Sequence, residues 1–207
     1  SLNDKEDHYQ MIKKLELSYE DHKTLFNYCK KIKIIFLSTP YDVESAKFLN
    51  KLGLKIFKTA SADLIDYSLH NYLAKLKKPV IISTGMSLKE DVEKTIQIYR
   101  KNKNFNIALL HCVSNYPCSL KSINLNVLNT LKKFGFIVGY SDHSNDVLIP
   151  CLAVSAGSRI IEKHFTLNKN LKGPDHKASL NTNELKKMIS QIRNTELVMG
   201  SDVKKIQ

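Results

Sequence analysis

The sequence predicts an α/β fold of the TIM (β/α)8-barrel type, with about six of the eight βα units present. Short apolar, β-branched runs recur along the chain, each followed by a turn and an amphipathic segment, which is the repeat of a parallel βα protein. The runs are continuously apolar, as strands covered on both faces require. Polar side chains stand at the ends of many runs, and a barrel gathers such residues at one face, whereas an open sheet uses one switch point.

The expected strands follow one another at about the spacing of a βα unit. They are Ile34–Thr39, Ile56–Ser61, Pro79–Thr84, Ile107–Cys112, Phe136–His143 and Arg159–Thr166. A complete barrel of this type has eight strands, so the first two are expected to be missing.

Helical periodicity and capping signals predict the remaining elements. Asp42 and Asn181 are placed as N-caps, Ser87 and Glu90 have capping-box spacing, and Gly53 ends a segment. The expected helices are Asp4–Lys14, Tyr19–Lys31, Val43–Leu52, Asp91–Lys101, Asn124–Phe134, Asn145–Ala156 and Thr182–Met199. No linker divides them, so residues 1–207 are expected to form a single, partial barrel domain.

Composition bounds the possible functions. A net charge of +12 invites a nucleic-acid interpretation, but the basic residues are almost all lysines spread along helix faces, whereas base readout favours arginine. No run is long enough to span a membrane and the first ten residues are no signal peptide. We expect a cytoplasmic protein that binds neither nucleic acid nor membrane, with its four cysteines as free thiols.

Two histidines stand at the ends of the last two expected strands. His143 closes Gly139-Tyr-Ser-Asp-His143, and His164 closes Glu162-Lys-His164. Side chains at the mouths of adjacent parallel strands can converge on one ion, and imidazole suits Mn, Fe or Zn. The alternative is that each histidine is a hydrogen-bonded core residue.

Anion-binding groups stand at the ends of other strands. Lys58 lies inside an apolar strand, which is costly unless the ammonium meets an anion; it could bind a phosphate or carboxylate, or pair with Glu162 structurally. Asp175, in a Gly-Pro-Asp-His turn, could orient a sugar hydroxyl or only shape the turn. The hydroxyls that could line one anion-binding cup are Thr39, Ser61, Ser83 and Ser141.

Taken in order, these segments resemble the sialic-acid synthases, which make N-acetylneuraminate and relatives such as legionaminate. The similarity runs from about Leu15 to Gly200. It is carried by Ser38-Thr-Pro-Tyr-Asp42, Phe57-Lys-Thr-Ala-Ser61, Lys78-Pro-Val-Ile-Ile-Ser-Thr-Gly-Met86, His111-Cys-Val-Ser-Asn-Tyr-Pro117, Gly139-Tyr-Ser-Asp-His143, Glu162-Lys-His-Phe-Thr166 and Gly173-Pro-Asp-His176.

The resemblance implies a transferase that condenses phosphoenolpyruvate with an N-acetylmannosamine-type amino sugar, or its 6-phosphate, to a sialic-acid-type nonulosonate and phosphate. It implies that His143 and His164 hold Mn²⁺ or Mg²⁺. Phosphoenolpyruvate would be held by Thr39, Lys58, Ser61, Ser83 and Ser141, and the sugar by Tyr116 and Asp175. Lys58 and Asp63 would be catalytic.

The chain also departs from the family. Asp63 replaces a glutamate that many members carry, and Ser114 stands where some have an asparagine that contacts phosphoenolpyruvate. A first-strand acid and lysine are absent, as is the antifreeze-like C-terminal domain through which the intact enzyme is expected to form a homodimer. We therefore expect this chain alone to be inactive.

Two alternatives remain open from the sequence. One is another barrel enzyme that handles phosphoenolpyruvate or a sugar phosphate, such as an aldolase using Lys58 as a Schiff base. The other is a non-catalytic basic binding domain.

Overall fold

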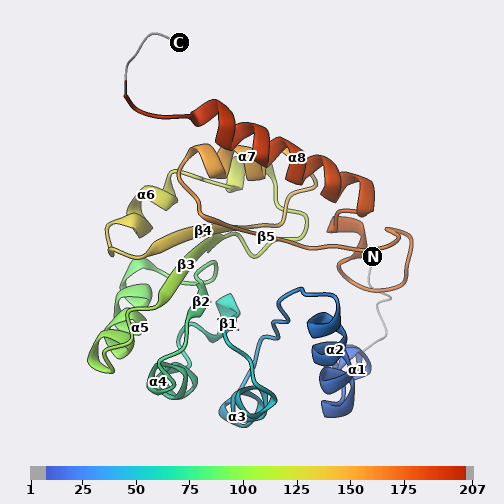
Figure 1. Ribbon diagram of the computed structural model, residues 1–207, viewed down its shortest axis with the longest axis vertical. Helices are drawn as coiled ribbons and strands as arrows, with labels where there is room; N and C mark the ends of the chain where they lie inside the picture. Colours follow the sequence, from blue (N-terminus) through green and yellow to red (C-terminus); the bar gives the residue numbers. More distant parts are fainter. Residues whose placement is uncertain (1–7, 204–207) are drawn as a thin grey trace.

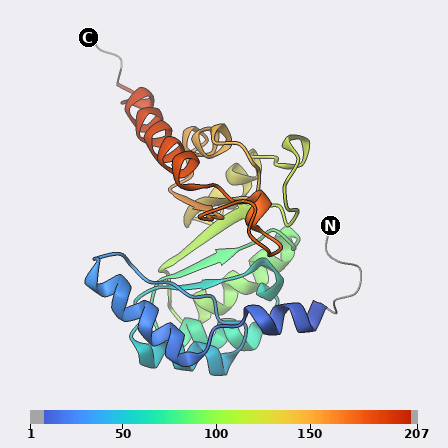
Figure 2. The same ribbon diagram turned by 90° about the vertical axis from the view of Figure 1, so that its right-hand side faces the viewer.

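Five parallel strands form one curled sheet in the order β1-β2-β3-β4-β5 in the computed structural model, which describes residues 8–203. The sheet curls into a half-barrel with the helices around its outer side (Figures 1 and 2). The strands are β1 (Phe57–Thr59), β2 (Val80–Ser83), β3 (Ile107–Cys112), β4 (Ile137–Asp142) and β5 (Ile160–Lys163). This arrangement confirms the predicted α/β barrel class.

Eight α-helices lie within the described residues. They are α1 (His8–Leu15), α2 (Tyr19–Lys31), α3 (Val43–Leu52), α4 (Tyr67–Lys75), α5 (Lys89–Lys101), α6 (Val127–Lys132), α7 (Leu148–Ser155) and α8 (Thr182–Met199), with short 3₁₀ turns at Ser61–Asp63, Leu120–Ser122 and His176–Ala178. The first residues of the helix expected at Asp4–Lys14 lie outside the described range. None of the helices in 8–203 combines the length and apolar character that crossing a bilayer requires.

The strand expected at Ile34–Thr39 does not form. Residues 34–40 have no regular secondary structure, and Ile34 and Ile35 are 59% and 71% exposed. A strand is held by ladder hydrogen bonds to a neighbour, and β1 pairs only with β2 among the described strands. The apolar run therefore lacks a partner, and the described residues supply five βα strands where six were expected.

Strand alternation separates the core from a polar inner face. On the side of the helices, Phe57, Ile82, Leu109, Val138 and Tyr140 belong to the main hydrophobic core. Their neighbours in sequence point to the other face of the sheet, because successive strand residues alternate. The inner face of the half-barrel thus receives Lys58, Ser83, Ser141 and Glu162.

Candidate active site

Lys58 reaches across the inner face of the half-barrel. Its Nζ lies 3.3 Å from Oε2 of Glu162 on β5 and donates a hydrogen bond to Ser83 Oγ at 3.2 Å. The lysine side chain is only 16% exposed, so its charge needs a partner. The ammonium is thus held in the cup by a carboxylate, and an incoming anion would compete with Glu162 for it.

Ser141 connects this ion pair to His143. Ser141 stands opposite Glu162 in the β4–β5 register and donates to Glu162 Oε1 at 2.7 Å. The same hydroxyl lies 3.3 Å from His143 Nε2. An unbroken line of polar contacts therefore runs from Lys58 through Glu162 and Ser141 to the first histidine.

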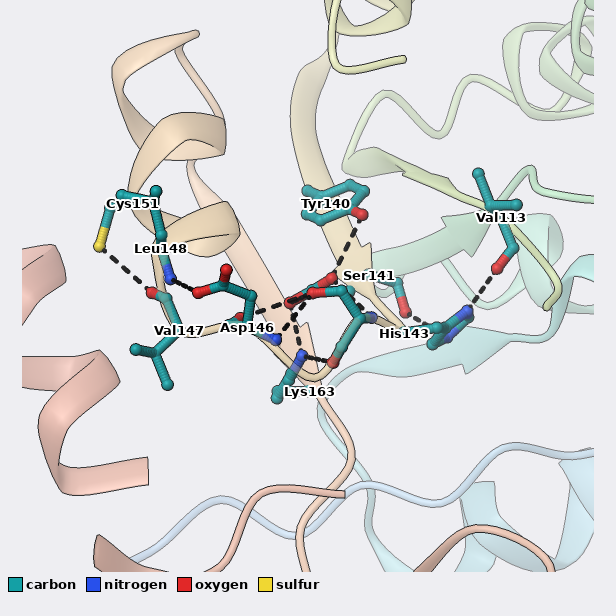
Figure 3. Close-up of polar contacts among 11 residues, drawn as sticks. Val113, Tyr140, Ser141, His143, Asp146, Val147, Leu148, Cys151 and Lys163 are labelled. Atoms are coloured by element: carbon teal, nitrogen blue, oxygen red, sulfur yellow. Dashed lines mark hydrogen bonds and ion pairs between the residues drawn. The ribbon is translucent and has the colours of Figure 1, made fainter. Parts of the chain in front are cut away.

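His143 has one ring nitrogen committed to the backbone. Its Nδ1 lies 2.7 Å from the Val113 carbonyl oxygen (Figure 3), and a carbonyl can only accept, so Nδ1 carries the proton and Nε2 keeps its lone pair. The side chain is buried, and this burial lowers its pKa. A neutral imidazole with a free Nε2 is the form that binds a metal ion.

His164, which follows β5, completes the pair. The two imidazole centroids are 5.4 Å apart with their planes at 78°. His164 Nδ1 also lies 3.7 Å from Asp175 Oδ2. These positions bring together the two histidines that the sequence predicts as metal ligands, with the predicted sugar-binding carboxylate beside them.

The donor set fits a metal ion with open positions. Within residues 8–203, no group of three or more His, Cys, Asp and Glu side chains is arranged to hold an ion. Two imidazoles would supply part of a coordination sphere, and water or substrate oxygens would supply the rest, as in catalytic rather than structural sites.

Tyr116 lies against both rings. Its ring centroid is 4.2 Å from that of His143 and 5.3 Å from that of His164. Burial raises the pKa of Tyr116 to about 12, so its phenol stays protonated at neutral pH and can donate a hydrogen bond to a ligand. It remains 46% exposed, as a residue that contacts a substrate must be.

Ser61 and Asp63 begin the loop after β1. Ser61 Oγ accepts the Gly85 N–H at 3.2 Å and lies 3.1 Å from Cys112 Sγ. The pKa of Asp63 is raised by burial and then by the nearby Asp66, and its Oδ2 finds no hydrogen-bond partner in the described part of the chain. The positive charge of Lys58 partly opposes this rise in the pKa of Asp63.

Four predicted residues have no hydrogen bond or ion pair to this network within residues 8–203: Ser61, Asp63, Thr39 and Ser114. Thr39 lies half-buried in the irregular segment before α3, and Ser114 is exposed in the loop after β3. Conversely, Glu162 was expected only as a structural partner of Lys58, although it contacts two cup residues. Its signal was available: it lies two residues before His164 on a strand, and therefore on the same face.

Comparison with known proteins points in the same direction. A family model described as the NeuB family matches residues 1–204. The chain is 46% identical to the N,N'-diacetyllegionaminic acid synthase of Campylobacter jejuni, over 97% of this chain and 61% of that protein. It is 43% identical to the Legionella pneumophila protein of the same name, over 95% of this chain and 57% of that protein. It thus spans about three-fifths of these relatives.

A solved structure shares the fold closely. The N-acetylneuraminic acid (sialic acid) synthetase from Leptospira borgpetersenii, in complex with citrate, superposes with a TM-score of 0.93 at 33% identity. The match covers 100% of this chain and 72% of that one.

Proposed function

Because this chain belongs to the NeuB family, we propose that it performs the condensation of phosphoenolpyruvate with an N-acylated amino sugar to a nonulosonate and phosphate. The acceptor would be of the N-acetylmannosamine type or its 6-phosphate. The residues of this chain would contribute the part of the active site that lies on the barrel.

One observation carries the proposal. The anion-binding candidates Lys58, Ser83 and Ser141 lie on the same inner face as the histidine pair. Contacts link them in the order Lys58–Glu162 (3.3 Å), Glu162–Ser141 (2.7 Å) and Ser141–His143 (3.3 Å). An enzyme that joins an anionic enol phosphate to an aldehyde needs anion-binding groups beside an electrophilic centre. This face would provide both within one network.

The residues divide into three roles. Thr39, Lys58, Ser61, Ser83 and Ser141 would bind the phosphate and carboxylate of phosphoenolpyruvate as charge and hydroxyl donors. Held by His143 and His164, Mn²⁺ or Mg²⁺ would polarise the aldehyde oxygen of the sugar as a Lewis acid.

The remaining groups would handle the sugar and the water. Tyr116 can donate its phenol proton to the sugar, and the carboxylate of Asp175 can accept from a sugar hydroxyl. The enol carbon then bonds to the aldehyde carbon, water adds to the resulting cation, and phosphate leaves. Asp63 would orient that water, and Lys58 would compensate the negative charge of the departing phosphate.

The Campylobacter and Legionella relatives are named as N,N'-diacetyllegionaminic acid synthases, which supports a legionaminic-type sugar as the product. We also propose that the enzyme is cytoplasmic and that the intact enzyme is a homodimer. The homodimer rests on the family resemblance alone.

Titration calorimetry of the 207-residue chain with phosphoenolpyruvate, in the presence of Mn²⁺, tests the anion site. Lys58→Met should weaken binding about 10- to 100-fold, the size expected for a lost charged hydrogen bond. Glu162→Gln should not weaken binding, because it removes the competing carboxylate. Lys55→Met, at an exposed lysine near β1, is the matched control and should bind normally. Equal affinities for Lys58→Met and the unchanged chain would exclude the proposed cup.

A further inference from the structure

The two histidines are each preceded by one member of a buried ion pair. Asp142 precedes His143 and Lys163 precedes His164. Lys163 Nζ lies 2.5 Å from Asp142 Oδ2, and the two side chains are 3% and 0% exposed. They stand directly opposite each other in the β4–β5 register, on the face of the sheet turned away from the histidines.

Three further contacts of the pair, all with Ser144, hold the chain next to His143. Asp142 Oδ1 accepts the backbone N–H of Ser144 at 3.0 Å, and Asp142 Oδ2 accepts the Ser144 hydroxyl at 3.1 Å. Lys163 Nζ donates to the Ser144 carbonyl oxygen. Figure 3 shows Lys163 reaching from β5 toward the segment that carries His143. Residues on both sides of His143 are therefore tied to the residue before His164.

Tyr140 extends these contacts into the core. Its hydroxyl donates to Asp142 Oδ1 at 3.3 Å, and its ring is one of the largest fully buried side chains. The aspartate is thus also held by the hydrophobic layer under the helices.

A purely stabilising role explains this arrangement poorly. Removing two charges from water is costly, and replacing a buried ion pair by apolar groups is often neutral or stabilising. A pair that joins the backbones flanking two candidate ligands acts instead on their relative position, and partners behind ligands typically change metal affinity about 10- to 100-fold.

We propose that Asp142 and Lys163 are positioning residues that fix the separation and mutual orientation of His143 and His164. The inference rests on the proposed function for the identity of the ligand, but the geometry of the two rings can be measured without any metal. The pair would act through the backbone, since neither side chain faces the cup.

The test variant is Asp142→Asn with Lys163→Met. It removes both charges together, and the amide oxygen can still accept from Ser144, so the loop keeps its local turn while the link between strands is lost. Lys163 borders a cavity of about 660 Å³ between α7, β5 and α8, which gives the methionine room. Ser158→Ala is the control, because it deletes a buried hydrogen bond of 2.8 Å at the opposite end of β5.

The first measurement is the inter-ring nuclear Overhauser effect between His143 and His164 in the metal-free 207-residue chain, with the rings selectively labelled. We expect it to weaken at least threefold in the double variant and to be unchanged in Ser158→Ala. An unchanged effect in a folded double variant overturns the proposal, whether or not the chain binds metal.

The second measurement is Mn²⁺ affinity, with the nitrogen couplings seen by pulsed electron paramagnetic resonance. The double variant should bind about 10- to 100-fold more weakly and lose one of two imidazole couplings, while the control keeps both. If the unchanged chain shows no imidazole coupling at all, the proposed metal site fails while the ring geometry still decides the positioning role. If the double variant does not fold, Asp142→Asn alone is measured, because it leaves Lys163 two neutral oxygen acceptors. It should show the same changes in ring geometry and Mn²⁺ affinity, but smaller. Values equal to those of the unchanged chain overturn the proposal.

Discussion

Glu162 determines the character of the cup at the scale of single residues. The sequence suggested a basic, hydroxyl-lined site, but Lys58 is already compensated by this carboxylate at 3.3 Å. An anion can bind by taking over the ammonium, and Glu162 would then keep its bond to Ser141. A bound anion would therefore replace Glu162 at the ammonium, because Lys58 is already paired.

His70 on α4 gives a pH dependence unrelated to the active site. The ring is fully buried, its Nδ1 lies 2.9 Å from the Tyr99 hydroxyl, and burial lowers its pKa from 6.5 to about 4. The unfolded chain takes up a proton near pH 6.5 while the folded chain does not until about pH 4. The free energy of unfolding should therefore fall by about 3 kcal/mol as the pH drops through this window.

Urea denaturation of the unchanged chain and of His70→Asn, at several pH values between 7 and 4, measures this effect. Asparagine does not titrate, so the free energy of unfolding of the variant should change much less with pH in this range. The difference in free energy of unfolding between the two chains above pH 7 measures the loss of packing that does not depend on pH. A variant with the same slope as the unchanged chain would assign the dependence to another group.

Local signals predicted helix ends well and strand existence less well. Asp42 and Asn181 cap α3 and α8 as expected, each accepting a backbone N–H, because capping involves residues within one turn. The Ser87 box is wrong: the N-cap is Leu88, one residue further along the chain, and Asp91 accepts its N–H. The run Ile34–Thr39 has strand composition but no ladder partner among residues 8–203. Strand pairing joins segments that are far apart in sequence, so local composition cannot predict it.

The same limit applies to the site. The two histidines and Lys58 could be predicted because polar side chains in apolar strands are unusual. The Asp142–Lys163 pair could not be given a role, because its contacts depend on the register between β4 and β5, which no local pattern states.

Gly139 keeps β4 close to both neighbouring strands. A Cβ at this position would lie 2.4 Å from Leu110 Cδ2 and 2.7 Å from the Ile160 carbonyl oxygen, too close for real atoms. Gly139→Ala should therefore push β4 away from β5 and lower the free energy of unfolding by about 1–3 kcal/mol, as overpacking commonly does. Chemical denaturation at neutral pH measures the loss.

The control for this variant separates contact from backbone strain. Gly135 has a φ of +83° and no atom within 4 Å of a Cβ, so Gly135→Ala carries only the left-handed backbone cost of about 1–2 kcal/mol. Only Gly139→Ala should also disturb Mn²⁺ binding, since β4 leads into His143. Undisturbed binding in Gly139→Ala would show that the β4–β5 spacing tolerates the methyl group.

At the scale of the whole molecule, the half-barrel is open along its edges. The described strands form five-eighths of the barrel that this fold class closes, and apolar residues such as Ile34 and Ile35 remain exposed beside β1. Reaction intermediates with cationic character need a site that excludes bulk water. In the described residues, five strands line only part of the circumference of such a barrel, so the inner face is not enclosed by a complete sheet.

We therefore predict that the purified 207-residue chain binds phosphoenolpyruvate and Mn²⁺. In the presence of N-acetylmannosamine it should nevertheless release no detectable phosphate from phosphoenolpyruvate. A coupled phosphate assay, with calorimetry on the same sample, separates binding from turnover. Turnover above the rate without protein would show that the five-stranded half-barrel suffices.

The pairing of β4 with β5 has one more consequence, for how the sheet assembles. Ser141 faces Glu162 and Asp142 faces Lys163; a slip of one residue would send each side chain of β5 to the opposite face. Glu162 would then enter the buried layer beside Asp142, and Lys163 would leave it, which places two carboxylates together away from water. The charges that organise the cup thus also make the misaligned pairing the costly one during folding.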